Sequence, residues 1–328
     1  MMLKAGCWPI AAPFMGALIA AAPAHADPAH EAIELPGGNV FAENLDIDRD
    51  GSAYVGNVVG GVLKVSLKTG KASQWIKPGD FGTGSILGVL VDPVNKMVWL
   101  CSNDFSDAKI NIAGADKGAH LKGFDLKTGK GKTSLKFPID KAFCNDIAVS
   151  KDGTVYVTET NQSHIYRWKP GAAQLEDWLY DPALALNGKS GLDGIAFGGD
   201  GQLYVNNWQT NVIVRIAIKP DGSPGALTNL TLSRTPVMAD GLRLIDGLQF
   251  AMAEGGGKVS LVTVRGDKAE VRPLAEDLKE ATGVAVYEDA IWYSQGHMGV
   301  AFNPAARAQP LPASRITPVA LPEDAGSK

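Results

Sequence analysis

The chain has 328 residues, of which 45% are hydrophobic and 20% are charged, a composition that supports a sizeable core and excludes a largely disordered protein. Its 31 Lys and Arg are outnumbered by 35 Asp and Glu, and the net charge of −4 argues against a nucleic-acid-binding protein, which usually carries a basic surface. Glycine is in excess, with 38 residues against a usual share of about 7%, so the fold needs many tight turns.

Residues 1–26 predict a secretory signal peptide. Lys4 precedes an apolar segment from Cys7 to Ala22, and Ala24 and Ala26 supply the small residues of a cleavage site. The segment is short and interrupted by proline for a spanning helix, although a retained N-terminal anchor is the alternative. We therefore expect residues 27–328 to form one exported domain, periplasmic or secreted, with no membrane attachment after cleavage.

Six later segments share one pattern, in which two alternating strands flank a tight turn. Asp50-Gly51 and Asp152-Gly153 are examples of the turn dipeptides, which tolerate the positive φ that a hairpin needs. Apolar and polar residues alternate on both sides of each turn, as in β-strands. The pattern recurs about every 48 residues. The six hairpins span residues 41–57, 85–103, 143–160, 191–208, 238–254 and 281–297.

A third strand follows each of the first five hairpins, and a fourth, weaker strand leads into the next. Four antiparallel strands per unit, repeated six times, predict an all-β fold, a six-bladed β-propeller. Residues 315–322 are expected to add an inner or middle strand to the sixth blade, and residues 30–36 its outer strand, so that both termini close one ring. The second unit is longer, and the polar segment 104–118 is expected to be a lid or a surface insertion.

Only Cys101 and Cys144 remain after cleavage of the signal peptide. Two cysteines cannot be the framework of a secreted domain of this length, so the fold must rest on its own core. The two residues form either one disulfide or two buried thiols. The sequence has no Cys-x-x-Cys motif that would indicate a cysteine zinc site.

In a propeller, the strand starts and hairpin ends meet at one mouth of the central channel. The starts supply Glu43, Asn145, Asp193 and Asp240. Three carboxylates and an amide repel one another there unless a cation lies between them, and oxygen ligands of this kind suit Ca²⁺ or Mg²⁺, with Mn²⁺ and Zn²⁺ as alternatives. The polar hairpin ends at the same mouth include Glu159, Asn207, Trp208 and His297.

These motifs resemble the gluconolactonase and senescence-marker-type family of six-bladed propellers across nearly all of the mature chain. The resemblance implies a divalent cation, calcium first, and hydrolysis of a lactone or related ester. The positions that match the metal-ligand motifs of the family are Glu43 in FAENLDID, Asn145 of the Asn145-Asp146 pair, Asp193 in GLDGIAF, and Asp240 in MADGLRL.

The sequence also departs from the family. Asn44-Leu45 replaces the Gly-Pro that follows the first-blade Glu, and Phe143 replaces the Arg that holds a sugar-acid substrate. An aromatic pocket favours a more apolar small-molecule lactone or ester, contacted by Phe143, Glu159, Asn207 and Trp208. Asp240 or His297 is the expected general base.

Two other interpretations remain open. The chain is either an enzyme or a non-catalytic propeller that binds a small ligand or a partner protein on the same face, since a fold does not decide function. A propeller of the strictosidine-synthase type is a further alternative, which the oxygen-ligand set argues against. The sequence contains no Gly-x-Ser-x-Gly, His-Glu-x-x-His or phosphate-loop motif in a suitable context. We expect a monomer.

Overall fold

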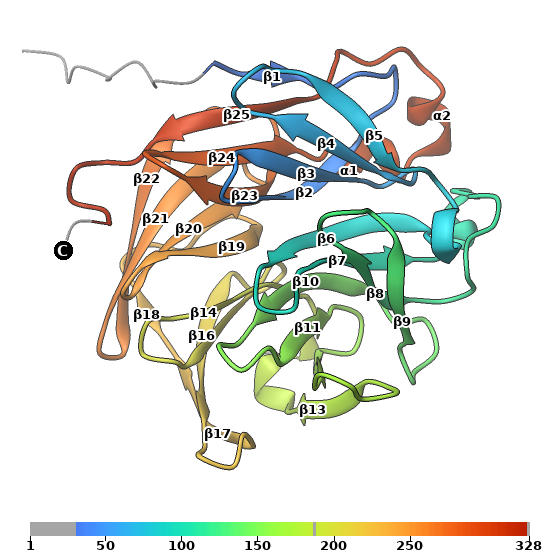
Figure 1. The fold of residues 1–328 in the computed structure, drawn as a ribbon. Helices are drawn as coiled ribbons and strands as arrows, with labels where there is room; N and C mark the ends of the chain where they lie inside the picture. The colour runs from blue at the N-terminus through green and yellow to red at the C-terminus, as the bar shows by residue number, and fades with distance from the viewer. Residues whose placement is uncertain (1–30, 186–187, 327–328) are drawn as a thin grey trace, which may run out of the picture.

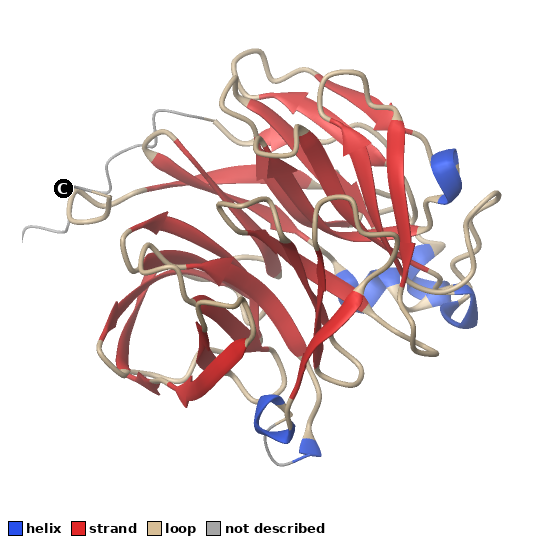
Figure 2. Ribbon diagram, turned by 60° about the horizontal axis from the view of Figure 1, so that its bottom comes forward, coloured by secondary structure: helices blue, strands red, loops and turns tan. Residues whose placement is uncertain are grey.

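The computed structural model describes residues 31–185 and 188–326, so the predicted signal peptide lies outside the described residues. Within these ranges, six antiparallel sheets form a ring, which confirms the predicted six-bladed β-propeller (Figure 1). The helices are few and short and lie outside the sheets (Figure 2). No helix of the described segments is long and apolar enough to cross a membrane.

Each blade runs outward from its first strand at the channel. The strands of blades 1 to 3 are β2–β5 (Ala42–Ile47, Ser52–Asn57, Val62–Ser66, Ala72–Ile76), β6–β9 (Ser85–Asp92, Met97–Asn103, His120–Asp125, Gly131–Lys136) and β10–β13 (Cys144–Val149, Val155–Glu159, His164–Trp168, Glu176–Tyr180). Those of blades 4 and 5 are β14–β17 (Leu192–Phe197, Leu203–Asn207, Val212–Ile218, Pro224–Asn229) and β19–β22 (Ala239–Asp246, Gln249–Glu254, Lys258–Arg265, Lys268–Ala275), and β18 (Thr231–Leu232) adds a parallel edge to β22.

Blade 6 joins the two ends of the described chain. Its order is β23 (Ala281–Tyr287), β24 (Ala290–Gln295), β25 (Arg315–Ala320) and β1 (Ile33–Glu34). Figure 1 shows the first strand, in blue, beside β25, in red. The predicted closure is confirmed, with residues 315–320 as a middle strand. Because the outer strand comes from the other end of the chain, the ring cannot open without breaking this sheet.

The short helices occupy the connections. They are the 3₁₀ turns η1 (Asp80–Gly82), η2 (Ser106–Ala108) and η3 (Pro182–Leu184), and the α-helices α1 (Met298–Ala301) and α2 (Pro304–Arg307). The predicted insertion 104–118 contains η2, and α1 and α2 lie between β24 and β25. The two segments pack together through a cluster that includes Ile110, Ala301 and Phe302.

The core is divided among the interfaces between blades. Alternating residues of neighbouring blades interdigitate there, as in the pair Trp99 and Trp168, whose ring centroids are 5.0 Å apart. Cys101, at the end of the second strand of blade 2, forms a disulfide with Cys144, at the start of blade 3. Of the two predicted alternatives for these cysteines, the structure selects the disulfide, which ties two blades together beside the channel.

Candidate functional site

Every blade has a β-bulge at the start of its first strand. In each hairpin the register shifts near the start of the first strand, across three residue steps, so that two residues of the first strand oppose a single residue of the second. The first bulged residues are the aligned positions of the repeat: Glu43, Leu87, Asn145, Asp193, Asp240 and Thr282. Six bulges around one channel therefore project one set of side chains toward a common mouth.

The second bulged residue is glycine in four blades. A Cβ added to Gly194 would lie 2.5 Å from the backbone oxygen of Asp240, and one added to Gly241 would lie 2.9 Å from that of Thr282. In these four blades the bulge therefore lies directly against the backbone of the next blade, which leaves no room for a side chain. This contact explains why glycine follows two of the predicted metal ligands.

Asn44 and Asp146 occupy the same position in blades 1 and 3, and their side chains enter the channel. Asn44 Nδ2 donates to Asp146 Oδ1 at 3.2 Å. Arg243 of blade 5 donates from both terminal nitrogens to Asp146, at 2.7 and 2.9 Å, and also to the backbone oxygen of Val89 at 3.1 Å. Since Asp146 and Arg243 are both buried, this ion pair connects four blades below the mouth.

A cavity of about 360 Å³ lies above this ion pair. All four predicted metal ligands line it, together with two of the predicted substrate contacts, Phe143 and Trp208. The remaining lining residues are Leu87, Met238, Met298 and Phe302. The structure thus brings together, in one pocket, residues from five blades and from the connection after β24.

Three oxygen atoms on the floor of the cavity are buried without a hydrogen-bond partner among the described residues. They are Glu43 Oε2, Asn145 Oδ1 and Asp193 Oδ1. The amide orientation is fixed, because Asn145 Nδ2 donates to Thr160 Oγ1 at 3.0 Å and to Asp193 Oδ2 at 2.9 Å. A buried acceptor without a donor costs free energy, and a positive group at this place would satisfy all three oxygens.

Burial and mutual repulsion raise the pKa values of all three carboxyl groups. Burial raises the pKa of Asp193 to about 7, with a further contribution from the charge of Asp146. Burial, and then the charges of Asp193 and Asp146, raise the pKa of Glu43 well above its usual range. The pKa of Asp240 is likewise raised by burial and by the charges of Asp193 and Glu43. The fold therefore holds these carboxyl groups close together although their charged forms repel one another and are poorly solvated.

The donor set fits a hard divalent cation. Within residues 31–185 and 188–326, no group of three or more His, Cys, Asp or Glu side chains is arranged to hold a metal ion, so the carboxylates would have to draw closer around one. The three unpaired oxygens supply what such an ion needs, because Ca²⁺ and Mg²⁺ take carboxylate and amide oxygens as ligands.

Glu159 and Asn207, two of the predicted substrate contacts, are not among the residues that line this cavity. Glu159 accepts hydrogen bonds from the backbone N–H groups of Phe143, Asn161 and Gln162. Asn207 accepts from the N–H groups of the two residues at 209 and 210. Both side chains satisfy backbone donors where the hairpin turns away, so their polarity serves the fold.

The same capping occurs at three other hairpin ends. Asn57 accepts from Phe41 N at 3.0 Å, Asn103 from Cys144 N at 2.9 Å, and Glu254 from Val237 N at 2.9 Å. The polar residues that alternate with the core therefore divide into two groups. Glu43, Asn145, Asp193 and Asp240 at strand starts face the cavity, and the hairpin-end residues named above bind backbone.

His297, a predicted base, is half-buried immediately before α1, with φ 50. It does not belong to the cavity lining, to which its neighbour Met298 contributes instead. Sequence reasoning missed Leu87, Met238, Met298 and Phe302 as lining residues. The repeat already aligned Leu87 with the ligand positions, and Met238 precedes Asp240 by two. Met298 and Phe302 come from a connection without a repeat, so no pattern indicated them.

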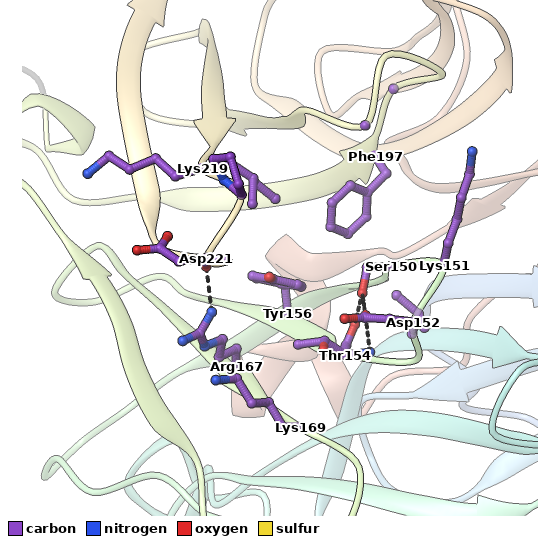
Figure 3. Close-up of a pocket in the computed structure, with 16 residues that line it drawn as sticks. Ser150, Lys151, Asp152, Thr154, Tyr156, Arg167, Lys169, Phe197, Lys219 and Asp221 are labelled. Carbon is purple, nitrogen blue, oxygen red and sulfur yellow. Dashed lines mark hydrogen bonds between the residues drawn. The ribbon is translucent and has the colours of Figure 1, made fainter.

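A larger cavity, of about 600 Å³, lies at the opposite ends of the strands, between blades 3 and 4 (Figure 3). Several of its polar groups are paired within the protein. Arg167 forms two hydrogen bonds with Glu176, at 2.8 and 2.7 Å, and one with Gly222 O at 2.6 Å. Asp152 accepts from Ser150 Oγ and Thr154 N. Among the described residues that line this cavity, no carboxylate or amide oxygen is buried without a hydrogen-bond partner, in contrast to the channel mouth.

The fold and the ring of bulges define a six-bladed β-propeller with a carboxylate-rich channel mouth. No family model matches the chain, and no curated protein matches its sequence. Solved structures share the fold at low sequence identity. A gluconolactonase from Xanthomonas campestris is 15% identical with a TM-score of 0.61, over 87% of this chain and 88% of that one.

Two other solved propellers are similar to the same extent. Regucalcin from Agrobacterium tumefaciens, described as a calcium-binding protein, is 16% identical with a TM-score of 0.59, over 89% of this chain and 95% of its own. A virginiamycin B lyase from Staphylococcus aureus is 16% identical with a TM-score of 0.59, over 88% and 83%. At such identities the likeness establishes the fold alone, and the lyase shows that this fold carries more than one chemistry.

Proposed function

We propose that the protein is a metal-dependent hydrolase of a lactone or related ester. The observation that carries this proposal is the group of three unpaired oxygen atoms, from Glu43, Asn145 and Asp193, on the floor of a cavity with apolar walls. The gluconolactonase among the structural neighbours supports it at the level of the fold.

The side chains of Glu43, Asn145, Asp193 and Asp240 would hold the cation. A divalent ion bound to them supplies Lewis-acid polarisation of a carbonyl oxygen and charge stabilisation for the oxyanion. Calcium is the first choice because carboxylate and amide oxygens are its usual ligands, with Mg²⁺, Mn²⁺ and Zn²⁺ as alternatives. The buried position of Glu43, Asn145 and Asp193 lowers the local dielectric constant, which strengthens electrostatic interactions on the floor.

Asp240 is the residue best placed to act as general base. It is half-buried at the floor, and its Oδ1 is fixed by the backbone N–H of Gly241 at 2.9 Å. The carboxylate takes a proton from the attacking water as the water oxygen bonds to the carbonyl carbon. When the acyl–oxygen bond breaks, the same proton passes to the leaving oxygen, and a hydroxy acid is released.

The alternative function is ligand or partner-protein binding on the same face without catalysis. Purified full-length protein, stripped of metal and then exposed to Ca²⁺, Mg²⁺, Mn²⁺ or Zn²⁺, should bind one cation and hydrolyse lactones in a chelator-sensitive reaction. Asp240→Asn should lower the rate at least about 100-fold, whereas Asp221→Asn, in an exposed turn, should leave it unchanged. Absence of cation binding, or full activity of Asp240→Asn, contradicts the mechanism; cation binding without turnover supports the alternative.

We also propose export. The predicted signal peptide at residues 1–26 supports it, and so does the Cys101–Cys144 disulfide, since disulfides persist mainly in oxidising compartments. N-terminal sequencing of the protein produced in a bacterial host should find Asp27 as the first residue in the periplasmic or secreted fraction. An unprocessed N-terminus in a membrane fraction would favour the retained anchor.

A further inference from the structure

The floor and the walls of the channel-mouth cavity differ in chemistry. The floor carries every polar side chain of the lining, from Glu43, Asn145, Asp193 and Asp240. The walls are formed by Leu87, Phe143, Trp208, Met238, Met298 and Phe302. Among the described residues that line the cavity, none is basic, and none of the wall residues carries a hydroxyl, amide or carboxyl group.

One side of the wall is packed firmly. The ring of Phe105, in the 104–118 insertion, contacts Phe143 edge-on with centroids 5.3 Å apart, and contacts Phe302 with centroids 5.0 Å apart. The insertion is also joined to the α1–α2 connection by a hydrogen bond from Arg307 Nη2 to Lys109 O at 2.8 Å. The 104–118 insertion of blade 2 and the α1–α2 connection of blade 6 therefore pack together and support one aromatic side of the cavity.

The opposite side of the wall is open. Trp208 is 36% exposed and Met238 42% exposed, and Val237 beside them is 51% exposed. Large apolar side chains are normally buried, and a group of exposed ones at the mouth of a cavity marks a surface that receives an apolar ligand. Methionine adapts to the shape of its contacts, and tryptophan presents a large flat area.

This division restricts what a substrate can carry. When the reacting carbonyl group of a substrate lies at the floor, the rest of the substrate contacts the apolar walls. Sugar lactones carry several hydroxyl groups, and the walls offer them only the indole N–H of Trp208, so hydroxyl groups that face the walls lose hydrogen bonds to water that the protein does not replace. A carboxylate or phosphate substituent would meet no cation in the walls. An alkyl or aryl substituent, in contrast, gains free energy by leaving water.

We propose that the substrate is a lactone or ester with an alkyl or aryl substituent, held between the Phe143–Phe302 side and the Trp208–Met238 side, and not a polyhydroxylated sugar lactone. This inference rests on the proposed hydrolase, but its binding step can be measured without turnover. Lactams have the shape of lactones and are not hydrolysed under the same mild conditions. The affinities of a series of alkyl-substituted lactams therefore measure contacts with the wall without any contribution from turnover.

The test is calorimetric titration of the full-length, calcium-loaded protein with δ-valerolactams that carry methyl, propyl, pentyl or heptyl groups at the ring carbon next to nitrogen. Affinity should rise about fourfold per added methylene and level off once the chain passes Trp208. Affinity that is independent of chain length, or tighter binding of a polyhydroxylated lactam, overturns the proposal.

Two wall variants and a control localise the effect. Trp208→Ala and Met238→Gln should weaken the pentyl lactam about tenfold and the methyl lactam less than twofold. Both side chains are partly exposed, so folding is not at risk. Tyr180→Ala, which removes an aromatic residue that is 60% exposed on the outer strand of blade 3, should change neither affinity. Equal losses for both lactams, or none, overturn the assignment of the wall.

Turnover of the matching lactones separates this inference from the proposed function. If the lactams bind with the expected chain-length dependence but no lactone is hydrolysed, the substrate wall stands as a binding site and the hydrolase proposal fails. If the protein hydrolyses gluconolactone faster than alkyl lactones, the hydrolase proposal stands and the wall assignment fails.

Discussion

Two groups of buried charge lie one above the other in the same channel, and they are balanced in opposite ways. In the lower group, Arg243 donates two hydrogen bonds to the Asp146 carboxylate. In the upper group, Glu43, Asp193 and Asp240 face the cavity with no basic residue among the described residues that line it. Asp146 of the lower group directly follows Asn145 in the sequence, yet Asn145 lines the cavity beside the upper group.

The comparison shows what the protein supplies for itself and what it leaves to a ligand. A buried carboxylate is stable only when paired or hydrogen-bonded, and the fold provides the partner for Asp146. It provides none for Glu43 Oε2 or Asp193 Oδ1. The upper group therefore carries negative charge that the protein leaves unbalanced, which the proposed cation would neutralise, and the lower group connects the blades that carry it.

Removal of the lower cation should have the largest effect. Arg243→Leu leaves Asp146 buried and unpaired, which should lower the free energy of unfolding by about 3–5 kcal/mol in urea titrations. The matched control is Arg265→Leu, which breaks an exposed ion pair with Glu270 and should cost no more than about 1 kcal/mol. Equal losses for the two variants would show that the lower pair does not stabilise the ring.

The pH dependence of metal-free protein should expose the upper group. The pKa of Asp193 is raised to about 7 in the folded state, so the folded protein keeps a proton that the unfolded chain has lost. Stability from this group is complete below about pH 4 and declines as the pH rises through 7, by up to about 4 kcal/mol. Urea titrations at pH 4.5, 6 and 8 measure it. Saturating Ca²⁺ should remove most of the decline, and a flat profile in chelator would contradict the charge imbalance.

Neutralising one upper carboxylate should give a smaller effect of opposite sign. Glu43→Gln removes charge repulsion at nearly constant volume, so the metal-free protein at pH 8 should become about 1–2 kcal/mol more stable. The same variant should lose most of the stabilisation that Ca²⁺ gives the unaltered protein. A matched variant, Glu276→Gln, changes an exposed carboxylate that pairs with Lys258 and should alter neither quantity. A Glu43→Gln protein that is less stable without metal would place Glu43 in a structural role.

Most of the fold could be predicted from the sequence because a propeller repeats its local pattern. The Asp-Gly turns and the alternating strands recur in phase, and the residues that open each first strand all lie at bulges. The same phase identified Glu43, Asn145, Asp193 and Asp240, which the structure brings to one cavity. The sequence repeat could identify these residues because each occupies the equivalent position in its own blade.

Periodicity could not separate two kinds of polar residue. Glu159 and Asn207 lie at hairpin ends in the same polar phase, but their oxygens accept backbone N–H groups. Whether a side chain at such a position faces a cavity or caps a turn depends on the path of the backbone after the hairpin. The ion pair of Arg243 could not be predicted from the repeat either, because its partner Asp146 is 97 residues away in another blade.

The sequence by itself determined the blades, their number, the closure of the ring and the residue types at the channel mouth, because these follow from local turn chemistry and a period of two. Only the tertiary structure decided which charges are paired, which oxygens stay unpaired and which apolar side chains form the walls. Those outcomes depend on distances between blades and between the two inserted connections, which no local pattern encodes. Burial then sets the electrostatic cost that makes the channel mouth a candidate for a cation.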